Sequence, residues 1–127
     1  MSWRSPVAAL VAGSLLLSST AVHAAPPSAA ADPDPWWGTD KALHMGVCAG
    51  ITGGGYGLAT QITDDVAGRA ALAASLGIGA GLGKEVLDAM GLGDPSWKDF
   101  LWDVIGTSLA VTVAVSIDFG VRAAKGK

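Results

Sequence analysis

The chain has few charges, no basic run and a single cysteine. Only 15% of its 127 residues are charged, and lysine and arginine never cluster. Because nucleic-acid binding needs a basic patch or stripe, we exclude DNA and RNA as partners. The lone cysteine, Cys48, excludes an intrachain disulfide. It lies far from the N-terminus and outside any lipidation motif, so we interpret it as a small apolar packing residue rather than a reactive thiol.

Apolar residues and glycine take the place of charge. Half of the residues are hydrophobic and 18 are glycine, and the formal net charge is −3. The length suits one small domain. A chain this apolar is unusual for a soluble domain, and the composition therefore indicates a membrane or envelope protein.

Residues 1–24 have the features of a secretory signal peptide. Arg4 supplies the positive start, residues 7–17 form an apolar stretch, and residues 22–24 fit the small-x-small cleavage rule. We therefore predict cleavage before Ala25. The alternative is a retained N-terminal anchor, but the apolar stretch is short for a membrane span.

Residues 25–38 are rich in proline and alanine and have no periodicity, which predicts a flexible tether. The tether ends in Trp36 and Trp37. Paired tryptophans at the edge of an apolar segment are typical of a membrane interface. The alternative is that the two rings staple onto the helix that follows them.

A domain of three helices is predicted over residues 39–124. The apolar segments and turn residues place these helices at residues 40–60, 66–90 and 95–123. Thr39 is the expected N-cap of the first helix. Asp94 is the expected N-cap of the third, with Pro95 in its first turn. The segment 91–93 contains two glycines and should end the second helix.

Glycines recur along the first two predicted helices. In water each would cost about 1 kcal/mol relative to alanine in a helix interior. In a membrane, small residues at every fourth position let helices pack closely. The first helix has this spacing at Gly46, Gly50 and Gly54, and the second has glycines at 77, 79, 81 and 83. Both faces predict helix packing within a membrane, and they also permit self-association.

Eight polar residues should meet at one end of this bundle. A cleaved signal peptide leaves the N-terminus outside, and three crossings then place Arg122, Lys125 and Lys127 inside, as the positive-inside rule requires. The same topology brings polar residues of all three helices to the outer end. These candidate site residues are Asp40, Lys41, His44, Lys84, Glu85, Asp88, Asp99 and Asp103. Because two of the uncharged runs contain only 14 residues, a soluble bundle is the alternative.

The chemistry of this layer has three interpretations. His44 and the carboxylates could bind a divalent metal ion, although Lys41 and Lys84 in the same layer would repel it, so we expect no cofactor. His44 could act as a general base, with a carboxylate to orient it. Ser96 is a conceivable nucleophile but fits better as a first-turn helix residue. The preferred interpretation is a structural network, with Lys84 paired to Asp88 and Lys41 paired to a carboxylate of the third helix.

Three pieces of the sequence, in order, resemble a bacterial envelope family. They are Asp40-Lys41-Ala-Leu-His44, Gly83-Lys84-Glu85-Val-Leu-Asp88, and Gly93-Asp94-Pro95-Ser96-Trp97-Lys98-Asp99 followed by Asp103 and Gly106. Together they resemble the YfiM-like family of uncharacterised periplasmic lipoproteins and, more distantly, the VanZ-like membrane proteins linked with glycopeptide resistance. The resemblance covers about residues 40–123 and implies a small helical envelope protein without an established activity. No cysteine follows the signal peptide here, so membrane attachment would fall to the helices.

The sequence therefore predicts an all-α, glycine-rich three-helix bundle that spans the inner membrane, with its polar site facing the periplasm or exterior. The expected role is structural, or an interaction that supports envelope integrity. The alternative is a membrane-interface enzyme or metal-dependent site that acts on a lipid-linked envelope substrate. Membrane lipid is the expected partner, and the small-residue faces permit an envelope protein or a second copy as another.

Overall fold

The structure, a computed structural model, describes residues 31–126. The predicted signal peptide, its cleavage site and the first part of the tether lie outside these residues. Three α-helices follow: α2 (Thr39–Ala59), α3 (Val66–Leu87) and α4 (Trp97–Ala124), and a short π-helix, η1 (Asp88–Leu92), continues α3. No strand occurs in the described part of the chain. The predicted all-α three-helix fold is confirmed.

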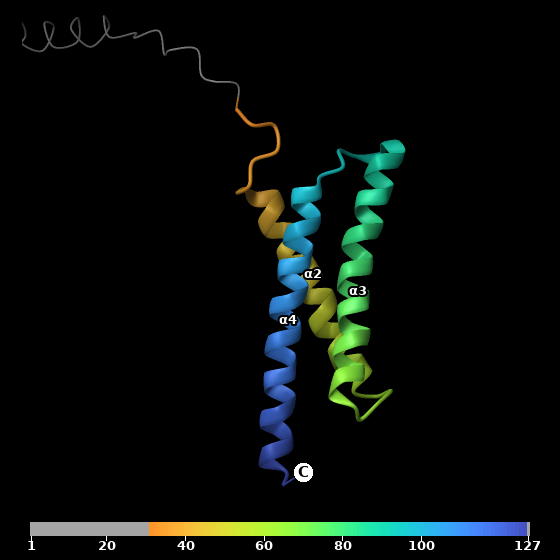
Figure 1. Ribbon diagram of the computed structural model, residues 1–127, viewed down its shortest axis with the longest axis vertical. Helices are drawn as coiled ribbons and strands as arrows, with labels where there is room; N and C mark the ends of the chain where they lie inside the picture. The colour runs from red at the N-terminus through yellow and green to blue at the C-terminus, as the bar shows by residue number, and fades with distance from the viewer. Residues whose placement is uncertain (1–30, 127) are drawn as a thin grey trace, which may run out of the picture. The chain divides into compact units, whose positions relative to one another are not determined.

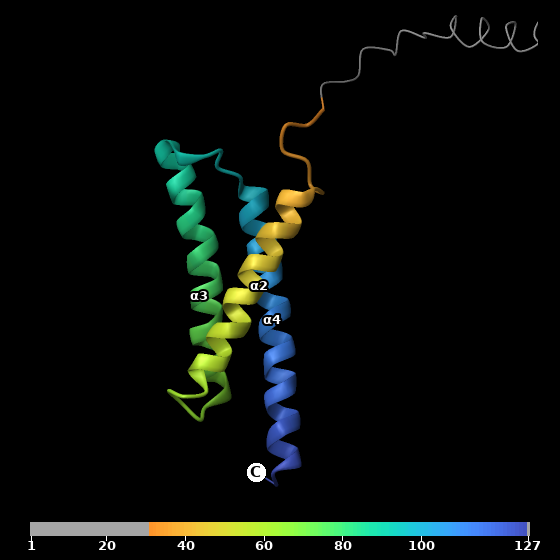
Figure 2. The same cartoon turned by 180° about the vertical axis from the view of Figure 1, so that it is seen from behind.

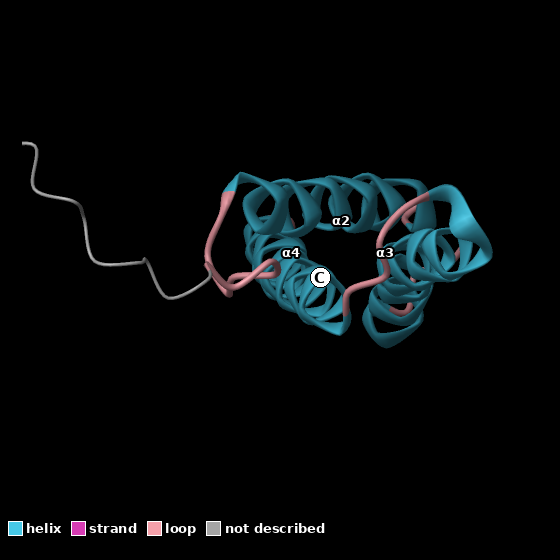
Figure 3. Ribbon diagram, turned by 90° about the horizontal axis from the view of Figure 1, so that it is seen from above, coloured by secondary structure: helices cyan, strands magenta, loops and turns pink. Residues whose placement is uncertain are grey.

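The helices alternate in direction. In Figure 1 α2 descends, α3 returns and α4 descends again, and Figure 2 shows the same arrangement from behind. Seen from above, α2 lies along both α3 and α4 (Figure 3), and each of the three helices contacts the other two. This up-down order places the start of α2, the end of α3 and the start of α4 at one end of the bundle.

Side chains and glycine define the helix ends. Asp65 caps α3 by accepting a hydrogen bond of 2.7 Å from the Gly68 N–H. Ser96 caps α4 by accepting one of 3.1 Å from the Asp99 N–H. The prediction that Asp94 caps this helix was wrong, since Ser96 has the extended backbone of a cap and α4 begins only at Trp97. Gly91, one residue before the end of η1, has a φ of 97°, a conformation that glycine adopts readily.

The start of α2 also differs from the prediction. Thr39 lies inside the helix, and Gly38 is its N-cap with no capping side chain. The reason is that the carbonyl of Gly38 already accepts the first helical hydrogen bond, from the Ala42 N–H at 3.1 Å. The expected cap at Thr39 was therefore wrong by one residue.

Polar side chains fill the interior of the bundle, and apolar side chains cover its outside. Among residues 31–126 the buried apolar side chains are few and mostly small: Cys48, Tyr56, Ala59 and Ala73. The buried polar residues are Lys41, Thr52, Arg69, Ser96, Asp99, Asp103 and Thr107. Large apolar side chains such as Leu76, Leu109 and Val113 are more than half exposed. This distribution is the reverse of a soluble core, where buried charges are rare.

Two helices of the described chain are long and apolar enough to cross a membrane. They are Val66–Leu92 and Trp97–Ala124, and only 22% and 11% of their most apolar windows are buried. The helix α2 does not combine the length and the apolar composition of a membrane span. Two potential spans are therefore supported by composition, where the sequence analysis predicted three.

Glycines hold the helices together at a few positions. A Cβ on Gly106 would lie 2.1 Å from the carbonyl oxygen of Met45, so α4 touches the backbone of α2 there. A Cβ on Gly77 would lie 2.0 Å from the hydroxyl oxygen of Thr52 and 2.5 Å from that of Thr107. Those two hydroxyls also hydrogen-bond to each other at 3.3 Å. Gly77 therefore lies where all three helices meet.

The predicted packing face of the first helix was wrong. Gly46, Gly50 and Gly54 have no atom of another helix within 4 Å of an added Cβ. The reason is the rotation of α2 about its own axis, which turns a different face toward α3 and α4. The buried residues of that face are Lys41, Cys48, Thr52, Gly55, Tyr56 and Ala59. The three predicted glycines face away from α3 and α4.

Candidate functional site

A buried polar cluster occupies the end of the bundle where α2 and α4 begin and α3 ends. Hydrogen bonds and ion pairs join all eight predicted site residues, and we call this set the His44 cluster. Its members are Asp40, Lys41 and His44 of α2, Lys84 and Glu85 of α3, Asp88 of η1, and Asp99 and Asp103 of α4. The predicted convergence of three segments at one depth is what the structure contains.

Lys41 is the most enclosed cation of the cluster. Its side chain is 2% exposed, and its ammonium donates to Asp99 at 2.5 Å and to Asp40 at 3.1 Å. It also donates to Asp34, which the sequence analysis did not include in the site. A buried ammonium with three carboxylate partners is well compensated, because buried charges persist only when they are paired. The predicted pairing of Lys41 with a carboxylate of the third helix is confirmed.

His44 lies between two carboxylates of α4. Its Nδ1 is 3.0 Å from Asp103 Oδ1, and its Nε2 is 3.4 Å from Asp99 Oδ2. The neutral ring has one N–H, so the tautomer decides which aspartate receives it. Either way the ring is oriented from both sides, and 16% of the side chain is exposed. The imidazole is therefore fixed at the edge of the buried cluster.

Asp103 is buried with one oxygen unpaired. Its Oδ1 is close to His44 and accepts a hydrogen bond of 3.2 Å from the Cys48 thiol. Its Oδ2 has no donor among the described residues, although the side chain is only 1% exposed. Gly81 makes room for it, because a Cβ at that position would lie 2.4 Å from Oδ2. A buried carboxylate oxygen without a donor is expensive and requires an explanation.

The end of α3 adds a cation and two carboxylates. Lys84 lies 2.7 Å from Asp88, 3.3 Å from Glu85 and 3.6 Å from Asp99. The predicted pair between Lys84 and Asp88 is confirmed. Glu85 also accepts a hydrogen bond of 2.6 Å from the Ser96 backbone N–H, which holds the start of α4 against α3. Lys84 is 41% exposed and is the least enclosed cation of the cluster.

Asp34 was missed because it lies in the proline-rich tether. Ser96 Oγ donates to its Oδ2 at 2.8 Å, and the Lys98 ammonium donates to its carbonyl oxygen. Hydrogen bonds from Lys41 and then Ser96 lower the pKa of Asp34 below its ordinary value. Ser96 thus caps α4 and binds Asp34, which leaves little support for the nucleophile interpretation. Nothing in the local sequence of Asp34 indicates these partners, since they come from α2 and α4.

The two tryptophans of the tether contact α4. Trp36 packs edge-on against Trp97, and Trp37 packs against Trp102, each with ring centroids 5.0 Å apart. The indole N–H of Trp102 also donates to the Trp36 carbonyl oxygen at 3.0 Å. The tether is therefore docked from Asp34 onward, and its last residues are not the flexible linker that was predicted. The rings pack on α4 rather than on the helix that follows them.

A second polar cluster lies at the opposite end of the bundle. Asp118 lies 2.7 Å from Arg69 and 2.9 Å from Arg122, and it accepts a hydrogen bond of 2.8 Å from the Tyr56 hydroxyl. We call these four residues the Arg69 cluster. It lines a cavity of about 500 Å³. The sequence analysis placed Asp118 and Arg122 near the helix end but did not identify this cluster, because Arg69 and Tyr56 stand alone in apolar segments.

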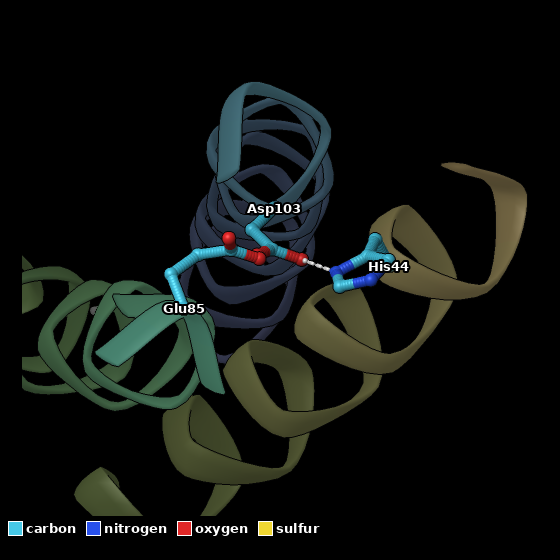
Figure 4. A group of neighbouring side chains, drawn as sticks. All are labelled: His44, Glu85 and Asp103. Carbon is cyan, nitrogen blue, oxygen red and sulfur yellow. Dashed lines mark hydrogen bonds and ion pairs between the residues drawn. The ribbon is translucent and has the colours of Figure 1, made fainter. Parts of the chain in front are cut away.

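Two groups of side chains have the composition of a metal site. One ligand atom from each of His44, Glu85 and Asp103 lies within 4.8 Å of the others, and Figure 4 shows the three side chains pointing toward one another from separate helices. Asp34, Asp40 and Asp99 form a second group. Because all three are bound to the Lys41 ammonium, that position already holds a cation. Within the described residues, only the His44 group contains a buried oxygen without a hydrogen-bond partner, Asp103 Oδ2.

Fold and site together define a class: a small three-helix protein with a polar interior, an apolar exterior and a charged cluster at each end. Comparisons with protein-family models, with curated proteins and with solved structures found no match to this chain. The resemblance to the YfiM-like and VanZ-like families therefore stays a prediction from the sequence.

Proposed function

We propose that this chain is a small bacterial envelope protein, embedded in the inner membrane with the His44 cluster toward the periplasm, that has a structural or interaction role in envelope integrity. One observation carries the proposal: charges are buried inside the bundle while large apolar side chains cover its surface. Lys41 and Asp103 are at most 2% exposed, whereas Leu109 is 55% and Val113 58% exposed.

This distribution suits a lipid environment. A charge at the centre of a bilayer costs about 2.5–3.5 kcal/mol, and burial between helices avoids that cost. In water the same surface would leave an extended apolar area without cover, which is typical of membrane or partner contacts. The apolar surface of α3 and α4 supports lipid as the main partner.

The proposal places all three helices across the membrane. The helices α3 and α4 have the length and composition to span it. Because α2 contacts both of them, it would lie at the same depth. The basic residues Arg122 and Lys125 lie at the end opposite the His44 cluster, which supports a cytoplasmic C-terminus. Trp36, Trp37 and Trp97 lie beside the His44 cluster, where an aromatic belt at the outer interface would be expected.

The contacts of the His44 cluster favour a structural role. Its ion pairs join three helices and the end of the tether, so they set the register of the bundle. A second role, as a membrane-interface enzyme on a lipid-linked substrate, is favoured by one observation. His44, oriented by Asp103, lines an open cavity of about 160 Å³ whose other walls include Leu43 and Val47. An imidazole beside an apolar groove could act as a general base.

Alkaline carbonate extraction tests the membrane placement. We expect the protein to stay in the membrane pellet, and release into the supernatant would contradict the proposal. Orientation is tested with single cysteines at Asp94 or Gly126 in a Cys48→Ala chain, labelled in intact cells with a membrane-impermeant maleimide. The cysteine at position 94 should react, and the one at position 126 should react only after permeabilisation.

Variants of His44 separate the two roles. We expect His44→Ala to lower the thermal stability of the protein. Any loss of envelope integrity should then be proportional to the loss of folded protein. A His44→Ala protein that folds and accumulates normally but no longer supports envelope integrity would favour the enzyme instead. Asp94→Asn is the matched control, because Asp94 is exposed at the same end of the bundle.

A further inference from the structure

We propose that His44, Glu85 and Asp103 bind one divalent transition-metal cation between the three helices. Each helix supplies one ligand, and the three ligand atoms lie within 4.8 Å of one another (Figure 4). The site needs only the folded bundle, so it does not depend on the envelope role proposed above. A bound cation would also account for the unpaired oxygen of Asp103, which the network of ion pairs does not explain.

The unpaired oxygen of Asp103 points to a ligand. Asp103 Oδ2 is buried at the bottom of the cluster and has no donor in the described part of the chain. Buried polar atoms in folded proteins nearly always have a partner, and an ion is one of the accepted explanations for an exception. Glu85 is half-buried nearby; the Ser96 N–H holds its Oε2, and its Oε1 lies 3.3 Å from the ammonium of Lys84, which is the cation that a metal would displace. A cation at this point would satisfy the carboxylate that the protein leaves open.

The ligand atoms of His44 and Asp103 need little adjustment, whereas Glu85 has to approach them from within 4.8 Å. Two ligands of one tetrahedral metal ion, each bound at about 2.0–2.2 Å, lie roughly 3.3–3.6 Å apart. His44 Nδ1 is already 3.0 Å from Oδ1 of the Asp103 carboxylate, whose other oxygen, Oδ2, is the unpaired one. Glu85 would exchange its contact with Lys84 for the metal and bring Oε1 to the same point. Three protein ligands leave a position open for water or substrate.

The surroundings of His44 match those of a metal-binding histidine. Such a ring usually donates its second N–H to a carboxylate, which fixes its orientation. Here Nδ1 faces Asp103, and Nε2 faces Asp99 at a distance of 3.4 Å. Asp99 is itself held by Lys41. The arrangement therefore contains the ligand and the group that orients it.

Charge also favours a cation. More carboxylates than ammonium groups lie in and beside the His44 cluster. The six carboxylates are those of Asp34, Asp40, Glu85, Asp88, Asp99 and Asp103, and the three ammonium groups are those of Lys41, Lys84 and Lys98. Lys84 is the competitor nearest the site, but it is 41% exposed and can turn toward solvent. One imidazole nitrogen and two carboxylate oxygens suit Zn²⁺ or Mn²⁺, and the absence of a thiolate from the three ligands does not favour Cu⁺.

Metal titration of the purified full chain tests the site. After chelation and removal of the chelator, Zn²⁺ alone and Mn²⁺ alone are titrated by calorimetry, with the bound metal counted by mass spectrometry. We expect one equivalent per chain and a metal-dependent rise in the melting temperature. Wild-type protein that binds less than half an equivalent of either metal would overturn the proposal.

Variants locate the bound metal. His44→Gln, Glu85→Gln and Asp103→Asn should each weaken binding at least tenfold, and Asp94→Asn should leave it unchanged. Lys84→Met should bind more tightly than wild type, because a competing positive charge is removed. This gain does not depend on the ligand variants remaining folded. Equal affinity in wild type, Lys84→Met and His44→Gln would place the metal elsewhere and overturn the proposal.

Discussion

The ammonium of Lys41 and the carboxylate of Asp99 lie 2.5 Å apart, both nearly inaccessible to solvent, between the first turns of α2 and α4. These residues are 58 positions apart in the chain. Asp99 is also 3.4 Å from His44 and 3.6 Å from Lys84, so this pair is the centre of the His44 cluster. Its loss should therefore affect the whole end of the bundle.

Lys41→Met should destabilise the bundle by about 3–5 kcal/mol, because it leaves Asp99 buried without its main counter-charge. Lys84→Met is the matched control. Lys84 is 41% exposed, and an exposed ion pair contributes about 0–1 kcal/mol. Unfolding in mixed detergent micelles, followed by circular dichroism, measures both. Equal losses of stability in the two variants would contradict the burial argument.

Gly106→Ala should separate α2 from α4. The added methyl group would lie 2.1 Å from the backbone oxygen of Met45, which cannot rotate away, so we expect a loss of about 1–3 kcal/mol. Gly120→Ala on the same helix is the control, since nothing lies within 4 Å of its added Cβ. It should be neutral or slightly stabilising. Thermal melts that rank the two variants in the opposite order would show that α2 and α4 do not touch at Gly106.

Asp118→Asn should loosen the end of the bundle opposite the His44 cluster. It removes the carboxylate shared by Arg69, Arg122 and Tyr56, while Asp64→Asn removes one that is fully exposed. We expect a clear fall in melting temperature for Asp118→Asn and none for Asp64→Asn. Hydrogen exchange of α3 should increase near Arg69 and stay unchanged near Lys84. Faster exchange at both ends would mean that the two clusters are coupled.

The docking of Asp34 should weaken in acid. Its pKa is lowered from the ordinary value of 3.8 by its hydrogen bonds to Lys41 and Ser96, so the undocked carboxylate takes up a proton first. The contribution of Asp34 is therefore complete above about pH 4 and is lost as the pH falls through the lower pKa of the docked state. The indole N–H resonance of Trp102, which donates to Trp36, reports docking.

Asp34→Asn provides the comparison for this titration. In that variant the Trp102 signal should lose the acid transition, whereas Asp94→Asn should keep it. A transition of the same size in Asp34→Asn would assign the effect to another carboxylate.

Part of the site could be predicted from the sequence, because the alternating direction of the helices is enough to bring its residues to one end of the bundle. Helices joined by short loops alternate in direction, so Asp40, Glu85 and Asp99 had to lie at one end once three helices were predicted. Sequence spacing also identified the pair between Lys84 and Asp88, because residues four apart share one helix face. Asp34 could not be found in this way. Its partners lie on α2 and α4, and its proline-rich surroundings favour an extended tether.

The glycines show the same limit. Their spacing identified Gly46, Gly50 and Gly54 as a packing face, yet these residues face outward. The rotation of α2 follows instead from Lys41, Thr52 and Tyr56, whose polar groups find partners only inside the bundle. Burying them satisfies more polar groups than burying the glycines would.

The sequence by itself determined the three helices, their order and the end at which the charged residues gather, since these depend on local periodicity and connectivity. The tertiary structure decided how each helix is rotated, which glycines touch, where Asp34 docks, and that Arg69 and Asp118 form a second cluster. It also decided that Asp103 keeps one oxygen unpaired. The physical reason is that helix rotation is set by pairing polar groups across helices, and those partners lie far apart in the chain.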